Sequence, residues 1–209
     1  MSASETSSCD CTGDTKRAER DPAYRRALWI VIVLNLGFGL IEIVGGFLAD
    51  SQALKADALD FIGDGSISLL GLVALGWAPR ARSQIALTQG IFLGLLGIGV
   101  IGSALWRTMN AVVPDAELMG AIGVVALIVN VTAALVLSRF RAGDANVTAI
   151  WLFSRNDAIA NVAVIVAAGL VAWTGAAWPD LVVAGVIALL FLHSAYEIVR
   201  NARRELRPA

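Results

Sequence analysis

Residues 56–65 read ADALDFIGDG and begin an apolar segment that runs to about residue 78. The segment is long enough to cross a bilayer, since a helical span needs about 20 mostly apolar residues. It nevertheless carries three carboxylates, Asp57, Asp60 and Asp64. Acids inside a membrane span are costly, and they are kept mostly where they line a polar path or a binding site. This stretch therefore predicts a membrane-spanning helix with a functional site in it.

The composition of the whole chain agrees with a membrane protein. The 209 residues are 57% hydrophobic and 16% charged, whereas a soluble domain has about 25% charged residues. Segments of spanning length follow one another with short connections at 27–49, 56–78, 85–106, 117–137, 147–173 and 179–199. We therefore expect an all-α membrane protein of six transmembrane helices with antiparallel neighbours. The formal net charge of −1 gives no indication of a nucleic-acid partner.

The polar residues outside these segments predict how the chain is divided and oriented. We expect a disordered polar tail over 1–26, a six-helix transport domain over 27–200 and a short basic tail over 201–209. Lys and Arg residues concentrate in both tails and in the connections after the second and fourth segments. Basic residues collect on the cytoplasmic side of membranes, so both termini are expected there. Cys9 and Cys11 lie in the first tail, too close together for a structural disulfide.

The spacing of the acids in the second segment indicates a shared ion. Asp60 and Asp64 are four residues apart and so lie on one face of a helix, with Asp57 about one turn further along. Two carboxylates held so close repel each other unless a cation lies between them or one of them is protonated. The same oxygens can then hold either a metal ion or protons, which is the chemistry of a metal/proton exchanger.

A further acid is expected at the same depth. Asp64 lies about 8 residues, or about 12 Å, from the outer end of the second segment. Asp157 lies about 10 residues, or about 15 Å, from the inner end of the fifth segment. Both positions are near the middle of a hydrocarbon core about 30 Å thick. Asp60, Asp64 and Asp157 are therefore predicted to converge from two helices, at the depth where transporters tend to bind their ions.

Other polar residues within the segments have more than one interpretation. Glu42 and Asp57 are predicted to support the site or to carry protons, because a buried acid costs more than a buried amide. Asn35 and Asn130 are expected to form hydrogen bonds between helices. An alternative is that the acids serve only helix packing, or that they pair with Arg155.

Three stretches resemble the membrane domain of the cation diffusion facilitator (cation efflux) family. They are EIVGGFLADSQALKADALDFIGDGSISLLGL at 42–72, FSRNDAIANVAVIVAA at 153–168 and WPDLVVAGVIALL at 178–190. The resemblance covers residues 25–207, and the order of the stretches along six segments adds to its specificity. Asp60 and Asp64 match the paired acids of the family's second helix, and Asp157 matches an acid of the fifth.

The resemblance implies export of a divalent transition metal, most often zinc, in exchange for protons. It implies a tetrahedral metal site that includes Asp60, Asp64 and Asp157, and a homodimer in the lipid bilayer. The metal is the substrate, so neither a cofactor nor an enzymatic activity is expected. A multi-pass protein of the bacterial inner membrane, with cytoplasmic termini, is the expected location.

The sequence departs from the family pattern at two places. The fourth ligand position is occupied by Phe153, which cannot bind a metal. Water, Asn161, Asn156 or Ser154 would have to complete the shell. Because an all-oxygen set is harder than a typical zinc site, zinc, cobalt, iron and manganese all stay open as substrates. The cytoplasmic C-terminal domain of many members is also missing, so a fold without that domain is expected.

Two other functions are compatible with aspartates on two helices. A partner subunit that does not transport would keep the fold and lose a ligand, as at Phe153. An intramembrane aspartyl protease would also need two aspartates, but its Gly-x-Gly-Asp signature is replaced here by Phe61-Ile62-Gly63-Asp64. Transport of a metal ion is the interpretation that explains three acids with a close pair.

Overall fold

The computed structural model describes residues 21–73, 77–110, 112–138 and 145–206, without the side chains of 71, 79, 82 and 145–156. Six helices lie within these ranges, and each overlaps one predicted span. They are α2 (Pro22–Leu48), α3 (Gln52–Val73), α4 (Pro79–Met109), α5 (Ala116–Ser138), α6 (Ala145–Thr174) and α7 (Trp178–Leu206). The prediction of six helices is thus confirmed, although α2 begins before residue 27 and α7 continues beyond residue 199.

Local sequence explains where several helices begin and end. The Asp21 side chain accepts a hydrogen bond of 2.9 Å from the Ala23 amide, and Pro22 occupies the first turn of α2. Asp50 follows α2 with a φ of 56°, and Gly175 follows α6 with a φ of 62°. A residue with positive φ directs the chain away from the helix axis, as is common at helix C-termini. The connections to α3 and α7 are therefore short and sharply turned.

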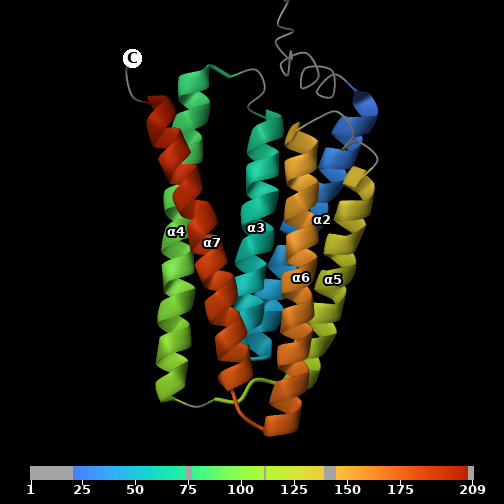
Figure 1. Cartoon of the computed structure of the whole chain (residues 1–209), viewed down its shortest axis with the longest axis vertical. Helices are drawn as coiled ribbons and strands as arrows, with labels where there is room; N and C mark the ends of the chain where they lie inside the picture. The colour runs from blue at the N-terminus through green and yellow to red at the C-terminus, as the bar shows by residue number, and fades with distance from the viewer. Residues whose placement is uncertain (1–20, 74–76, 111, 139–144, 207–209) are drawn as a thin grey trace, which may run out of the picture.

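The helices run up and down in one bundle, and the start of α2 lies at the same end of it as the end of α7 (Figure 1). We call this the terminal end, where α2 begins and α7 ends. At the opposite, distal end, α3, α5 and α7 begin and α2, α4 and α6 end. The closest helix pairs are α4 with α7, α2 with α3, and α5 with α6. The α3 helix contacts all five other helices, so it occupies the interior of the bundle.

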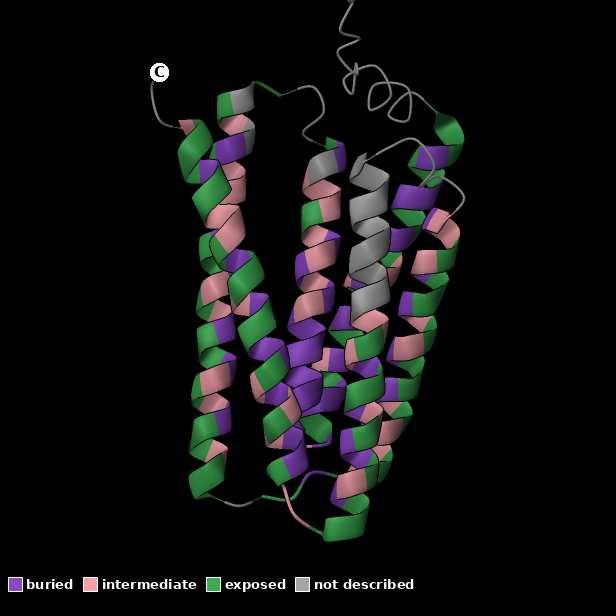
Figure 2. Ribbon diagram, viewed as in Figure 1, coloured by how far each residue is buried: buried purple, intermediate pink, exposed green. Residues whose placement is uncertain are grey.

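Burial is uneven along the bundle. Figure 2 shows that buried residues concentrate in the half nearer the distal end. The largest apolar cluster lies there and joins residues of five helices and the α2–α3 turn, including Ala53, Leu54, Leu59, Leu93, Met119, Val164 and Phe191. Among the described side chains, burial is thus greatest toward the distal end, and two smaller apolar clusters, around Leu28 and around Leu137, lie nearer the terminal end.

The outer faces of the helices are apolar, as a bilayer requires. Exposed side chains include Val33, Leu40, Ile41, Val44, Phe92, Leu95, Ile98, Leu135, Val166 and Leu189. Five helices contain a described segment long and apolar enough to cross a membrane. The α3 helix is not among them, because Lys55 and its three aspartates interrupt its apolar sequence. The chain is therefore a multi-pass membrane protein whose most polar helix is enclosed by the others.

Glycine permits the close approach of α2 and α3. A Cβ atom added to Gly39 would lie 2.8 Å from Ile62 Cγ1, 3.1 Å from Phe61 Cβ and 3.2 Å from the Ala58 carbonyl oxygen. Contacts this short leave no room for a side chain. Gly37 lies two residues earlier on α2, and a Cβ there would meet nothing within 4 Å.

The substitution Gly39→Val is expected to destabilise the protein by about 1–3 kcal/mol, the usual cost of overpacking a well-packed interior. The matched control Gly37→Val adds the same side chain to the open face of the same helix. Thermal unfolding in detergent micelles measures both. Equal losses of stability in the two variants would contradict close α2–α3 packing at Gly39.

Candidate functional site

Three carboxylates from two helices lie at one level of the bundle. Asp60 and Asp64 lie one turn apart on α3, and Asp157 approaches from α6. The Asp157 carboxylate lies near both α3 carboxylates. All three side chains are partly exposed. The structure therefore brings together the three residues that the sequence predicted as metal ligands.

These carboxylates are near one another without forming a finished metal site. Among the described residues, no three His, Cys, Asp or Glu side chains are arranged to hold a metal ion as they stand. The side chains of Phe153, Ser154, Arg155 and Asn156 fall outside the described residues, so the predictions for them are not tested. An ion bound by Asp60, Asp64 and Asp157 requires their oxygens to draw closer together.

The three carboxylates lie where the buried part of α3 ends. Residues 51–59 are all buried, whereas Asp60, Asp64 and most residues beyond them toward the terminal end are partly exposed. On the distal side the apolar cluster around Leu54 and Leu59 separates the acids from the bundle end. The three acids therefore lie at the level where the fully buried stretch of α3 gives way to partial exposure.

A chain of buried amides holds the third acid of α3. Asn130 on α5 donates a hydrogen bond of 2.9 Å to Asn161 Oδ1 on α6, and Asn161 Nδ2 donates one of 2.5 Å to Asp57 Oδ2. These three side chains are at most 2% exposed. The prediction of an interhelical hydrogen bond at Asn130 is confirmed. Asn161 thus bonds to side chains of α3 and α5 in the structure, and its role as a weaker candidate metal ligand stays a prediction.

Glu42 is the most isolated acid of the interior. Its side chain is 0% exposed, and neither carboxylate oxygen has a hydrogen-bond partner. It lies close enough to Asp57 for the two carboxyl groups to form a hydrogen bond if one is protonated. Two ionised carboxylates cannot donate hydrogen bonds to each other. A proton shared between Glu42 and Asp57 would supply the missing donor and remove the repulsion between the two groups.

The sequence did not single out Asp180, which is 1% exposed at the distal end. Its oxygens accept hydrogen bonds from Ser51 Oγ, from the Gln52 amide and from the Ala53 amide. An acid in the first turn of a helix ordinarily stabilises its own helix N-terminus. Asp180 follows that pattern in α7, so nothing in the sequence indicated that it also binds the N-terminus of α3.

A protein-family model described as the cation efflux transmembrane domain matches residues 28–207. The zinc transporter ZitB of Escherichia coli is 29% identical over 195 residues, which are 87% of this chain and 62% of ZitB. A cadmium, cobalt and zinc/H(+)-K(+) antiporter of Bacillus subtilis is 26% identical over 196 residues, 86% of this chain and 62% of the antiporter. Metal tolerance protein 1 of Arabidopsis thaliana is 35% identical over 111 residues, 49% of this chain and 27% of that protein. The chain thus spans about three fifths of the length of the two bacterial relatives.

The substitution Asn161→Ala is expected to lower stability by about 1–3 kcal/mol, because it leaves Asp57 and Asn130 buried without their partner. Asn130→Ala removes one bond and is expected to cost less. The control Val162→Ala changes an exposed neighbour on α6. Thermal unfolding in detergent gives the order, and an Asn161→Ala variant as stable as the Val162→Ala variant would contradict the bonded amide chain.

Proposed function

The chain belongs to the cation efflux family, and from this premise we propose that it exports a divalent metal cation across a membrane in exchange for protons. The observation that carries the proposal is the approach of Asp60, Asp64 and Asp157 at the level where the fully buried stretch of α3 ends. The proposed activity is transport, with the metal as substrate and no chemical conversion.

In the proposed mechanism Asp60, Asp64 and Asp157 provide the metal ligands. Three carboxylates at this distance repel one another, and a divalent cation between them removes the repulsion. Protons on the same oxygens remove it as well, so metal and protons compete for one set of groups. This competition couples export of the metal to entry of protons.

The donor set limits the choice of metal. Oxygen ligands favour harder cations than the His and Cys ligands of typical zinc sites. The E. coli relative is named a zinc transporter, and the B. subtilis relative is named for cadmium, cobalt and zinc. We propose zinc as the first substrate to test, with cobalt, iron and manganese as the alternatives. Water from the terminal end would complete the coordination shell.

Glu42 and Asp57 provide a path for protons in this proposal. Both residues lie nearer the distal end than Asp60, Asp64 and Asp157, and neither is one of the proposed metal ligands. Neither carboxylate oxygen of Glu42 has a hydrogen-bond donor in the structure, so this group is free to take up a proton in the proposed path. Protons that enter from the distal side would meet Glu42 and Asp57 before they reach Asp60.

The orientation follows from the basic residues and the burial. We propose that the terminal end faces the cytoplasm of a bacterial cell, because Lys and Arg residues concentrate there. The structure then corresponds to a state that takes up metal from the cytoplasm, with the distal end closed. Release would follow a movement of helices that opens the distal end, as in alternating access.

A homodimer remains a prediction from the family resemblance. Two glycines of α4, Gly90 and Gly97, do not support it, because they pack against α7 of the same chain. A Cβ added at Gly90 would lie 2.9 Å from Val199, and one at Gly97 would lie 2.8 Å from Leu192. A Cβ added at Gly99 or Gly102 would meet nothing within 4 Å, so the outer face of α4 stays open to a second copy.

Metal uptake into proteoliposomes under an imposed pH gradient tests the proposed transport. Each of Asp60→Asn, Asp64→Asn and Asp157→Asn is expected to reduce uptake to the level of protein-free vesicles, because each removes a charged ligand. The control Asp115→Asn makes the same change at an exposed site on the distal surface and is expected to transport normally. If the wild type and Asp64→Asn show the same uptake for zinc, cobalt, iron and manganese, the chain does not transport these metals. That result is the one expected of a partner subunit that does not transport.

The substitution Glu42→Gln is expected to separate metal movement from proton coupling. Glutamine keeps the size and polarity of the side chain but cannot exchange a proton. Uptake driven by a metal gradient should persist, whereas its stimulation by a pH gradient should be lost. The control Glu117→Gln changes an exposed acid in the first turn of α5. Normal pH stimulation in the Glu42→Gln variant would exclude Glu42 from the proton path.

A further inference from the structure

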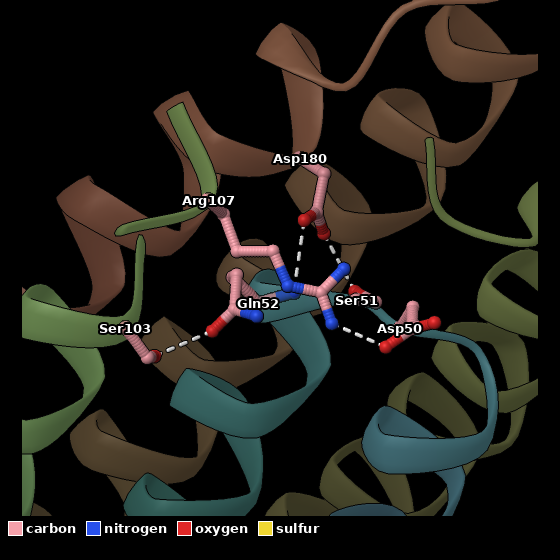
Figure 3. Close-up of polar contacts among 6 residues, drawn as sticks. All are labelled: Asp50, Ser51, Gln52, Ser103, Arg107 and Asp180. Atoms are coloured by element: carbon pink, nitrogen blue, oxygen red, sulfur yellow. Dashed lines mark hydrogen bonds and ion pairs between the residues drawn. The ribbon is translucent and has the colours of Figure 1, made fainter. Parts of the chain in front are cut away.

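Polar side chains from three places in the sequence meet at the distal end around the start of α3 (Figure 3). Asp180 lies at the centre of this group, with hydrogen bonds of 2.6 Å from Ser51 Oγ, 2.8 Å from the Gln52 amide and 3.0 Å from the Ala53 amide. We call Asp180, Ser51 and these two amides the distal clamp. One buried carboxylate thus accepts three hydrogen bonds from the beginning of one helix.

The distal clamp satisfies the start of α3 in an unusual way. The first amides of a helix have no partner within the helix, and a side chain just before the helix usually supplies one. Ser51 does so here for the Leu54 amide at 3.1 Å. The Gln52 and Ala53 amides are instead bound by Asp180, which is more than 120 residues away in sequence. The negative charge of Asp180 also suits the positive end of the α3 dipole.

Asp180 binds α3, which carries Asp60 and Asp64, and it lies in the helix that follows α6, which carries Asp157. Asp180 is in the first turn of α7, a few residues after the end of α6 at Thr174. The α3 helix packs mainly on α2 and α7 and has few contacts with α6. The Asp57–Asn161 hydrogen bond joins α3 directly to α6, and the distal clamp adds a second polar link, between α3 and α7, which also contacts α6.

The α4 helix restrains the same turn from another side. Ser103 Oγ donates a hydrogen bond of 2.6 Å to Gln52 Oε1, and Arg107 forms an ion pair with Asp50. These contacts involve side chains only, whereas Asp180 binds the backbone of α3. A hydrogen bond to a backbone amide in the first turn restrains the whole helix along its axis, because a stiff helix moves as one body.

We propose that Asp180 is a positioning residue for the metal site, which holds α3 at the height where Asp60 and Asp64 are level with Asp157. Asp60 is eight residues from Gln52, about 12 Å along a stiff helix, so a shift at the clamp is transmitted to both carboxylates. The inference rests on the proposed metal transport, because it assigns Asp180 a role in the same site.

Transport kinetics of the full chain in proteoliposomes provide the first test. Asp180→Asn keeps the shape of the side chain but removes its charge and one acceptor oxygen. The KM for zinc is expected to rise on the order of tenfold, as when residues that orient metal ligands are changed. Ser51→Ala removes one of the three bonds and is expected to raise the KM less. In the double variant the effects should not add, because both substitutions act on one clamp.

The matched control is Asp115→Asn, which makes the same substitution at another helix start of the distal end. Asp115 accepts hydrogen bonds from the Glu117 and Leu118 amides of α5, a helix without any of the proposed ligands. Its KM for zinc is expected to equal that of the wild type. An equal rise of KM in the Asp115→Asn and Asp180→Asn variants would show a general loss of stability and overturn the positioning role.

A distance measurement tests the height of α3 without relying on transport. Spin labels are attached through Ile67→Cys on α3 and Ile159→Cys on α6, two exposed positions, after Cys9→Ser and Cys11→Ser. Asp180→Asn is expected to shift or broaden the distance distribution measured by electron paramagnetic resonance, and Asp115→Asn to leave it unchanged. A wild-type distribution in the Asp180→Asn variant overturns the inference, whatever its KM.

The outcomes separate the inference from the proposed function. If the wild type moves no metal, the proposed function fails, and the inference fails with it as a statement about a metal site. If the wild type transports and Asp180→Asn shifts the labels without a change in KM, the proposed function stands and the inference is overturned. If Asp180→Asn does not fold, Ser51→Ala undergoes both measurements and decides in the same way.

Discussion

A carboxylate inside a membrane protein must find a hydrogen-bond donor, a cation or a proton, because lipid offers none of these. The α3 helix carries three such groups and is enclosed by all five other helices. Asp57 is satisfied by the amide of Asn161, which Asn130 holds in turn. Asp60 and Asp64 lie further along α3, opposite a third carboxylate rather than a donor. The arrangement thus satisfies one acid and leaves the others available to an ion.

This division coincides with the packing of the bundle. The satisfied acid lies in the tightly packed distal half, and the available acids lie where partial exposure begins. A transporter needs both parts, because an ion must reach its ligands from one side while the other side is closed. The polar contacts of the distal end add stiffness where α3 begins, so the same helix is anchored at one end and accessible beyond its middle.

Much of this could be predicted from the residues in order. Apolar length predicted each of the six helices, and helical spacing predicted that Asp60 and Asp64 share a face. Depth predicted that Asp157 would lie at their level. The spacing could not predict the partners of Asn161, which the sequence indicated only as a candidate to complete the metal shell. That choice depends on how α5 and α6 rotate against α3, and periodicity leaves this rotation undetermined.

The distal end marks the limit of what local sequence determines. The existence of the six helices, the positions of the acids and the charge asymmetry of the connections follow from the sequence alone, because each depends on residues close together in the chain. The bond from Asp180 to the amides of Gln52 and Ala53 joins residues more than 120 positions apart. Only the packed bundle brings the start of α7 against the start of α3, because that approach is the sum of many helix–helix contacts and has no signal at either residue.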